Sequence, residues 1–114
     1  MQIKVLTRHF TLTKALQNYT ERRLRFALSS FDDHIRNIIV RLSDINGSRG
    51  GAGKRCHIQV VSDGMPDLII EDTQADLYIA IKNATDCTRR TFHRRIERKQ
   101  RSFRQAASFN FGFS

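Results

Sequence analysis

Apolar residues recur at helical spacing over 76–99, the longest patterned stretch of the chain. At about 100° per residue, one side of this stretch collects Leu77, Ala80, Ile81, Ala84, Thr88, Thr91 and Phe92. No proline or glycine interrupts it, and the carboxylate of Asp76 can accept hydrogen bonds from the free N–H groups of a first helical turn. The pattern predicts a helix that Asp76 caps and that its apolar stripe holds to a core.

The other side of this predicted helix is positively charged and collects Lys82, Arg89, Arg90, His93 and Arg94. After Asp86, only Glu97 interrupts the positive run. A charged stripe is commonly a solvated face, but charge of one sign indicates a surface for a polyanion. Because the excess is not balanced along the helix, we favour the polyanion contact.

A second helix is predicted over 14–28, where the residues Leu16, Tyr19, Leu24 and Ala27 fall on one side. Thr11 and Thr13 both precede it, and both offer an N-cap. Its basic residues, from the second turn onward, are Arg22, Arg23 and Arg25. Arg23 falls close to the apolar side, so we expect its aliphatic stem to lie along the edge of the core.

Alternation and β-branched runs predict four strands, over 2–7, 35–42, 56–61 and 68–71, the last of which can continue to Thr73. A loop is predicted at 46–53, which holds four glycines, and a turn at Asp63 and Gly64. The predicted fold class is α+β in the order β-α-β-β-β-α, an antiparallel four-stranded meander with both helices on one face. The other sheet face is left for solvent or a partner.

Composition narrows the class of partner. The 114 residues suit one domain, and 20 Lys and Arg against 11 Asp and Glu give a net charge of +9. This excess favours nucleic acid or an anionic membrane surface. No apolar run reaches about 18 residues, so no membrane span is expected. The N-terminus lacks the apolar run of a signal peptide, and Cys56 and Cys87 form no metal pattern, so we expect a cytoplasmic protein with reduced thiols.

The apolar periodicity stops after Lys99. We therefore expect one domain over 1–100 and a flexible tail over 101–114. The tail is rich in phenylalanine, at Phe103, Phe109, Phe111 and Phe113. These rings could stack on bases or dock on a partner.

No catalytic constellation is recognisable, and we expect no enzymatic activity, metal, cofactor or small-molecule substrate. The four histidines are dispersed along the chain. The glycine-rich segment at 46–54 fails the P-loop pattern because no Gly-Lys pair is followed by Ser or Thr. A hairpin carrying Arg49, Lys54 and Arg55 can still contact RNA without sequence specificity.

Two segments resemble the ribosome hibernation-promoting factors, a family that includes the ribosome-associated translation inhibitor. The first is TRHFTLT at 7–13, which leads through Leu16 into ERRL at 21–24. The second, more specific, is DLYIAI at 76–81, which opens the last helix and is followed by spaced basic residues. The resemblance covers residues 2 to about 99.

The resemblance implies a fold like that of double-stranded-RNA-binding domains. It also implies binding to the small ribosomal subunit (16S rRNA) and the 70S ribosome, in the mRNA/tRNA channel, with inhibition of translation during stress or stationary phase. By position, Arg23, Arg90, Arg94 and Arg98 match the family's basic positions, and Arg89 is an additional charge. Together with Arg22, Arg25 and Lys82, they form the expected RNA-binding set. Cys87 and Phe26 stand where relatives commonly carry basic residues.

The resemblance also suggests that the second domain through which long members pair ribosomes is lacking, and we expect a monomer away from the ribosome. Whether the protein promotes or blocks ribosome dimerisation stays open. Two alternatives also stay open: a general double-stranded-RNA-binding protein, and a protein-interaction module that regulates transcription through the open sheet face. RNA binding predicts an affinity that falls steeply with salt, whereas the interaction module predicts little salt dependence.

Overall fold

The structure, a computed structural model, describes residues 1–45 and 53–111, with side chains up to Arg101. The predicted order β-α-β-β-β-α is confirmed. The elements are β1 (Gln2–Arg8), α1 (Lys14–Leu28), a short 3-10 helix η1 (Ser29–His34), β2 (Ile35–Asp44), β3 (Lys54–Ser62), β4 (Leu68–Gln74) and α2 (Leu77–Phe111). The predicted glycine-rich loop lies almost wholly outside the described residues.

The four strands form one sheet in the order β1-β2-β3-β4. The strands β2, β3 and β4 are antiparallel neighbours, as the turn signals predict. The expected meander is wrong for β1, which pairs in parallel with β2. The reason is that α1 carries the chain back along the sheet between these two strands, and such a crossover connects parallel strands.

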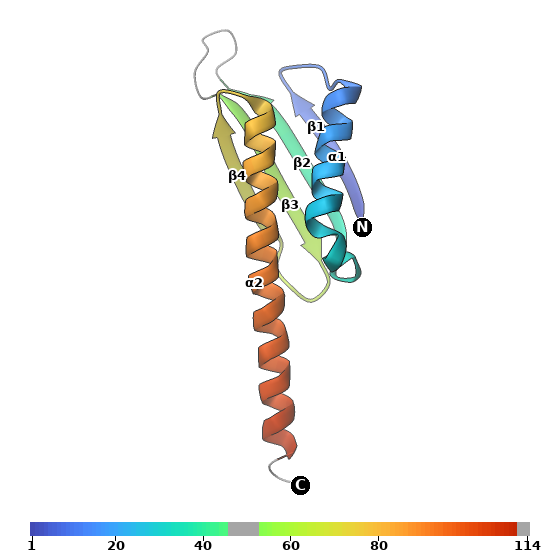
Figure 1. Ribbon diagram of the computed structural model, residues 1–114, viewed down its shortest axis with the longest axis vertical. Coiled ribbons are helices and arrows are strands. Elements are labelled where there is room, and N and C mark those ends of the chain that lie inside the picture. The colour runs from blue at the N-terminus through green and yellow to red at the C-terminus, as the bar shows by residue number, and fades with distance from the viewer. Residues whose placement is uncertain (46–52, 112–114) are drawn as a thin grey trace.

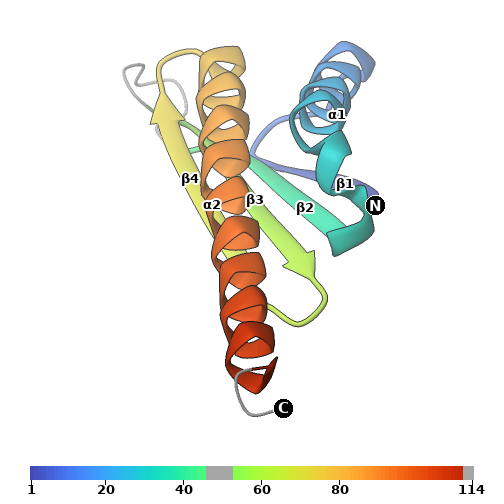
Figure 2. The same cartoon turned by 60° about the horizontal axis from the view of Figure 1, so that its bottom comes forward.

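Both helices cover the same face of the sheet, as predicted (Figures 1 and 2). Helix α1 packs near β1, and α2 packs on β3 and β4. The core between the layers contains Leu24 and Leu28 from α1, Val40 and Ile58 from the sheet, and Phe92 from α2, all fully buried. The opposite face of the sheet is not covered by any described element.

Hydrogen bonds fix where both helices begin. Thr13 caps α1, because its Oγ1 accepts from the backbone N–H of Leu16 at 3.2 Å. At α2, Asp76 Oδ1 accepts from the backbone N–H of Tyr78 at 2.9 Å. Of the two threonine candidates, only Thr13 is the cap, and the expected role of Asp76 is confirmed.

The backbone of α2 continues past Lys99 to Phe111 and extends well beyond the sheet (Figure 1). The expected end at Lys99 is therefore wrong. Apolar periodicity reports contact with the core, and Ile96 is the last buried residue of α2 among those whose side chains are described. Beyond it the chain has no proline, and no glycine before Gly112, to stop a helix. The division into a domain over 1–100 and a tail over 101–114 stays a prediction.

Candidate nucleic-acid interface

Helices α1 and α2 lie side by side and run in the same direction (Figures 1 and 2). Three contacts join α1 and η1 to α2, and they follow the same order along both segments. The Tyr19 and Tyr78 rings meet edge to face at 4.8 Å, Arg23 pairs with Asp86 at 2.8 Å, and the Phe31 and Phe92 rings are 5.3 Å apart. The two helices therefore form a fixed layer on which charges keep their relative positions.

Helix α2 is strongly basic on its exposed side. Between Leu77 and Arg101 it carries eight Lys or Arg and two acidic residues. The predicted basic side is solvent-exposed at Lys82, Arg89, Arg90, His93 and Arg94, and Arg98 is exposed as well. The predicted apolar side is buried, apart from the half-buried Leu77 and Thr91. The predicted phase of this helix is confirmed.

Contacts identify which side of α2 lies next to α1. Asp86 pairs with Arg23 of α1, and the His93 ring lies 5.9 Å from that of Phe31 in η1. Residues three or four apart share a helix side, so Lys82, Arg89 and Arg90 belong to the same side as Asp86. Arg90, Arg94 and Arg98 follow each other at intervals of four and form a continuous exposed row.

The three candidate arginines of α1 have different surroundings. Arg22 is exposed and borders a hollow that Phe26 also lines. Arg25 is exposed but also lines a second hollow with Lys4 of β1 and Asn37 of β2. The structure therefore places Arg25 on the outer side of α1, away from the basic side of α2.

Arg23 is the one candidate that is half-buried. Its Nη2 donates to Asp86 Oδ1 at 2.8 Å, while its Nε is buried without a hydrogen-bond partner among the described residues. The expected position of its stem at the core edge fits this burial. Asp86, which the sequence pattern does not connect with α1, binds Arg23 and partly neutralises it. A signal was present, because Asp86 is one of only two acidic residues on α2 up to Arg101.

An exposed aromatic ring lies next to the arginines of α1. Phe26 on α1 is 81% exposed, and it borders its hollow together with Arg22 and Arg25. Exposed aromatic and guanidinium planes are the groups on which proteins stack unpaired RNA bases. Phe26 therefore replaces the basic residue expected at this position with a different group that can contact RNA.

Two of the three basic residues of the predicted hairpin are described. Lys54 pairs with Asp44, so its charge is compensated within the sheet. Arg55 lies on β3 and belongs to the uncovered sheet face. Arg49 lies outside the described residues.

The described part of the chain contains no group of three or more His, Cys, Asp and Glu that could hold a metal ion. Burial, together with the nearby Asp72 carboxylate, raises the pKa of the Cys56 thiol to about 12. A thiol with so high a pKa is a poor nucleophile, because the thiolate is the reactive form. No described helix is both long and apolar enough to cross a bilayer.

The geometry defines a class of protein: a small α+β domain that presents a rigid basic helical layer on one side of a mixed sheet. The family described as "Sigma 54 modulation protein / S30EA ribosomal protein" matches residues 3–100, and the chain belongs to this family. One structural neighbour is named as a ribosomal subunit interface protein. No curated protein sequence matches the chain.

Two solved structures have the same fold. The N-terminal domain of Protein Y from Thermus thermophilus superposes with a TM-score of 0.68 at 30% sequence identity, over 82% of this chain and 98% of that one. A ribosomal subunit interface protein from Coxiella burnetii superposes with a TM-score of 0.72, over 85% of this chain and 99% of that one. At 16% identity, this second comparison supports the fold alone.

Proposed function

We propose that the protein binds the small ribosomal subunit in the mRNA/tRNA channel and inhibits translation there. The observation that carries the proposal is the exposed row Arg90, Arg94 and Arg98 on a helix fixed to the sheet by its buried side. Such a row brings several guanidinium groups to phosphates without the entropy cost of ordering a flexible segment.

Binding to ribosomal RNA releases the counterions condensed on its phosphates, which favours association at low salt. Exposed guanidinium planes, and the ring of Phe26, can stack on unpaired bases. Occupancy of the channel is enough to exclude mRNA and tRNA, so the mechanism includes no covalent step and the protein acts without enzymatic activity. A ribosome-bound protein of this kind works in the cytoplasm, and we propose that it is a monomer when free.

The family and the neighbouring structures support this proposal. The family description includes a ribosomal protein, and the Coxiella burnetii neighbour is named for the interface between ribosomal subunits. The Thermus thermophilus domain is 30% identical over most of this chain. Ribosome association belongs to the family, and the subunit, the channel and the contact residues are our proposal.

Co-sedimentation with purified small subunits tests it. The variant Arg90→Glu/Arg94→Glu should lose binding while it keeps the wild-type circular dichroism spectrum and melting temperature, because both side chains are exposed. The control Lys4→Glu/Arg36→Glu makes the same change in net charge at exposed strand residues away from the helical row and should lose far less binding. Wild-type binding by the helix variant would overturn the assignment of this surface.

Salt distinguishes ribosomal RNA from a protein partner. Affinity for the subunit should fall steeply as salt rises, with a log–log slope of roughly 0.7–0.9 per phosphate contact. The helix variant should show a shallower slope than the control variant. Equal affinity of the wild type for a short RNA duplex and for the subunit would instead favour the general double-stranded-RNA-binding function.

A further inference from the structure

The register of the strands fixes which side chains meet on the sheet face opposite the helices. Arg8 pairs with Ser43, and Ser43 pairs with Arg55, so these three residues form one row across β1, β2 and β3. The next row along the same face contains Leu6, Arg41 and His57. The sheet thereby brings together three arginines that lie far apart in the sequence.

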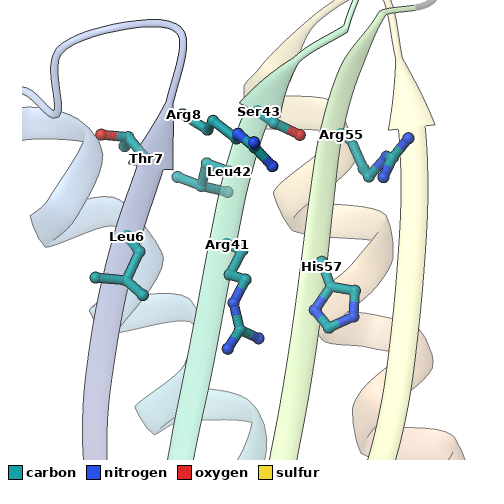
Figure 3. A pocket seen from close by; sticks show the side chains of 8 residues that line it. All are labelled: Leu6, Thr7, Arg8, Arg41, Leu42, Ser43, Arg55 and His57. Carbon is teal, nitrogen blue, oxygen red and sulfur yellow. The ribbon is translucent and has the colours of Figure 1, made fainter.

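These side chains surround a hollow of about 360 Å³. Its volume falls within the range of roughly 300–1,000 Å³ that ligand sites occupy. Figure 3 shows that the guanidinium groups of Arg8, Arg41 and Arg55 spread over the hollow and do not converge on one point. The helices lie behind the sheet in this view, so the hollow is separate from the basic helical layer.

The positive charge here is only partly compensated. Arg41 Nη1 donates to Gln59 Oε1 at 3.2 Å, and His57 Nε2 lies 3.6 Å from the carboxylate of Glu71. Among the described residues, no acidic side chain pairs with Arg8 or Arg55. The described ion pairs therefore leave the charges of Arg8 and Arg55 uncompensated on this face.

We propose that this hollow binds the phosphate groups of an RNA strand, as a second RNA contact on the face opposite the helices. The inference rests on the proposed function, because a domain held by its helices inside an RNA-lined channel turns its sheet toward further RNA. The domain would then hold RNA on both faces.

The chemistry of the hollow favours an RNA strand over other anions. Guanidinium groups and the Ser43 hydroxyl are hydrogen-bond donors suited to phosphate oxygens. Arg8 and Arg55 lie two strand spacings apart, roughly 10 Å, and their guanidinium groups lie apart in Figure 3, so they suit successive phosphates better than a single small anion. Leu6, which is 39% exposed, adds an apolar surface at which a ribose or base can lie.

Fluorescence anisotropy with a labelled 12-nucleotide single-stranded RNA tests the proposal on the full chain. The variant Arg8→Gln/Arg55→Gln should bind this RNA about tenfold more weakly, with a salt slope lower by roughly 1.4, since each single-strand phosphate contact contributes about 0.7. The control Lys4→Gln/Arg36→Gln removes the same charge outside the hollow and should change the affinity far less. Arg8→Lys/Arg55→Lys should keep most of the affinity, and all variants should melt as the wild type does.

Three results would overturn the proposal. The first is unchanged affinity and salt slope in the Arg8→Gln/Arg55→Gln variant. The second is an equal loss in the control, which would mean that only net charge matters. The third is binding of a labelled 12-residue polyglutamate, or of uridine monophosphate, as tight as that of the RNA and equally sensitive to the two arginines. None of these results bears on the helical layer, which the subunit co-sedimentation of Arg90→Glu/Arg94→Glu tests separately.

Discussion

The guanidinium group of Arg23 on α1 lies 2.8 Å from a carboxylate oxygen of Asp86 on α2. The pair joins the two helices, and it places the Asp86 carboxylate on the side of α2 that also carries Arg89 and Arg90. Both side chains remain partly exposed, at 30% for Arg23 and 45% for Asp86. Solvent therefore screens the pair, and its contribution to stability is small. Its larger effect is on the positive potential of the helical layer.

Asp86→Asn should strengthen RNA binding. The substitution removes a carboxylate from the basic layer and releases Arg23, so we expect a lower dissociation constant and a salt slope that is steeper by up to about one. The free energy of unfolding should fall by less than about 1 kcal/mol. Anisotropy titrations and urea unfolding measure the two effects.

Glu97→Gln is the matched control for this substitution, because Glu97 is paired with His93 and its removal frees no arginine. It should raise affinity less than Asp86→Asn does. Weaker RNA binding by the Asp86 variant would show that the pair orients Arg23 for binding instead of withholding it, and unchanged binding would show that the pair does not affect the RNA contact.

Sequence periodicity predicts α1 with its observed bounds, Lys14–Leu28, because a threonine that can cap the helix precedes apolar positions at helical spacing from Leu16 to Ala27. The same reasoning places the buried and exposed sides of α2 correctly. It fails for the direction of β1, since strand patterns carry no direction. The helix between β1 and β2 was the available signal, because such a crossover connects parallel strands.

The candidate site is predictable only in part. The exposure of the α2 arginines follows from the helical period. The partner of Arg23 depends on how α1 and α2 pack against each other, and the periodicity of one helix does not predict that packing. The row of Arg8, Ser43 and Arg55 depends on the register of three strands, and the pattern of each strand alone leaves that register undetermined. The far end of α2 escapes the pattern because no residue from Glu97 to Arg101 is buried, so no apolar side marks this part of the helix.

Arg94 and Arg95 are neighbours on α2 that should respond differently to charge reversal. Arg94 is exposed in the row with Arg90, whereas Arg95 Nη1 donates to the backbone carbonyl of Pro66 beside β4 at 2.8 Å. Arg94→Glu should weaken binding to the small subunit, and Arg95→Glu should weaken it much less. Equal losses in co-sedimentation would show that net charge governs binding, and not the position of the row.

Truncation to alanine should cost much more stability at the buried ring of Phe92 than at the exposed ring of Phe26. Phe92 is fully buried and contacts Phe31, so its truncation should cost about 3–5 kcal/mol of unfolding free energy. Phe26 is 81% exposed, and its truncation should change stability by no more than about 0.5 kcal/mol. Urea unfolding followed by circular dichroism measures both, and similar costs would mean that the layer between α2 and the sheet is not the core.

Stability should fall at alkaline pH through Cys56. Burial and the nearby Asp72 carboxylate raise the pKa of its thiol from 9.0 to about 12 in the folded protein. Below pH 9 the thiol is protonated in both the folded and the unfolded chain, so it adds no pH dependence. Between pH 9 and 12 the unfolded chain binds fewer protons than the folded one, and the free energy of unfolding decreases as pH rises.

Cys56→Ala isolates this effect, because Cys87 and every other titrating group are present in both proteins. The alanine variant should be less stable at pH 8, since it leaves a small cavity among fully buried residues. The stability difference between wild type and variant should then shrink above pH 9, by up to about 1.4 kcal/mol per pH unit. Urea unfolding of both proteins at pH 8, 9, 10 and 10.5 measures this difference. A difference that stays constant up to pH 10.5 would mean that the Cys56 thiolate forms as easily in the folded protein as in the unfolded chain, and that the site is open to water.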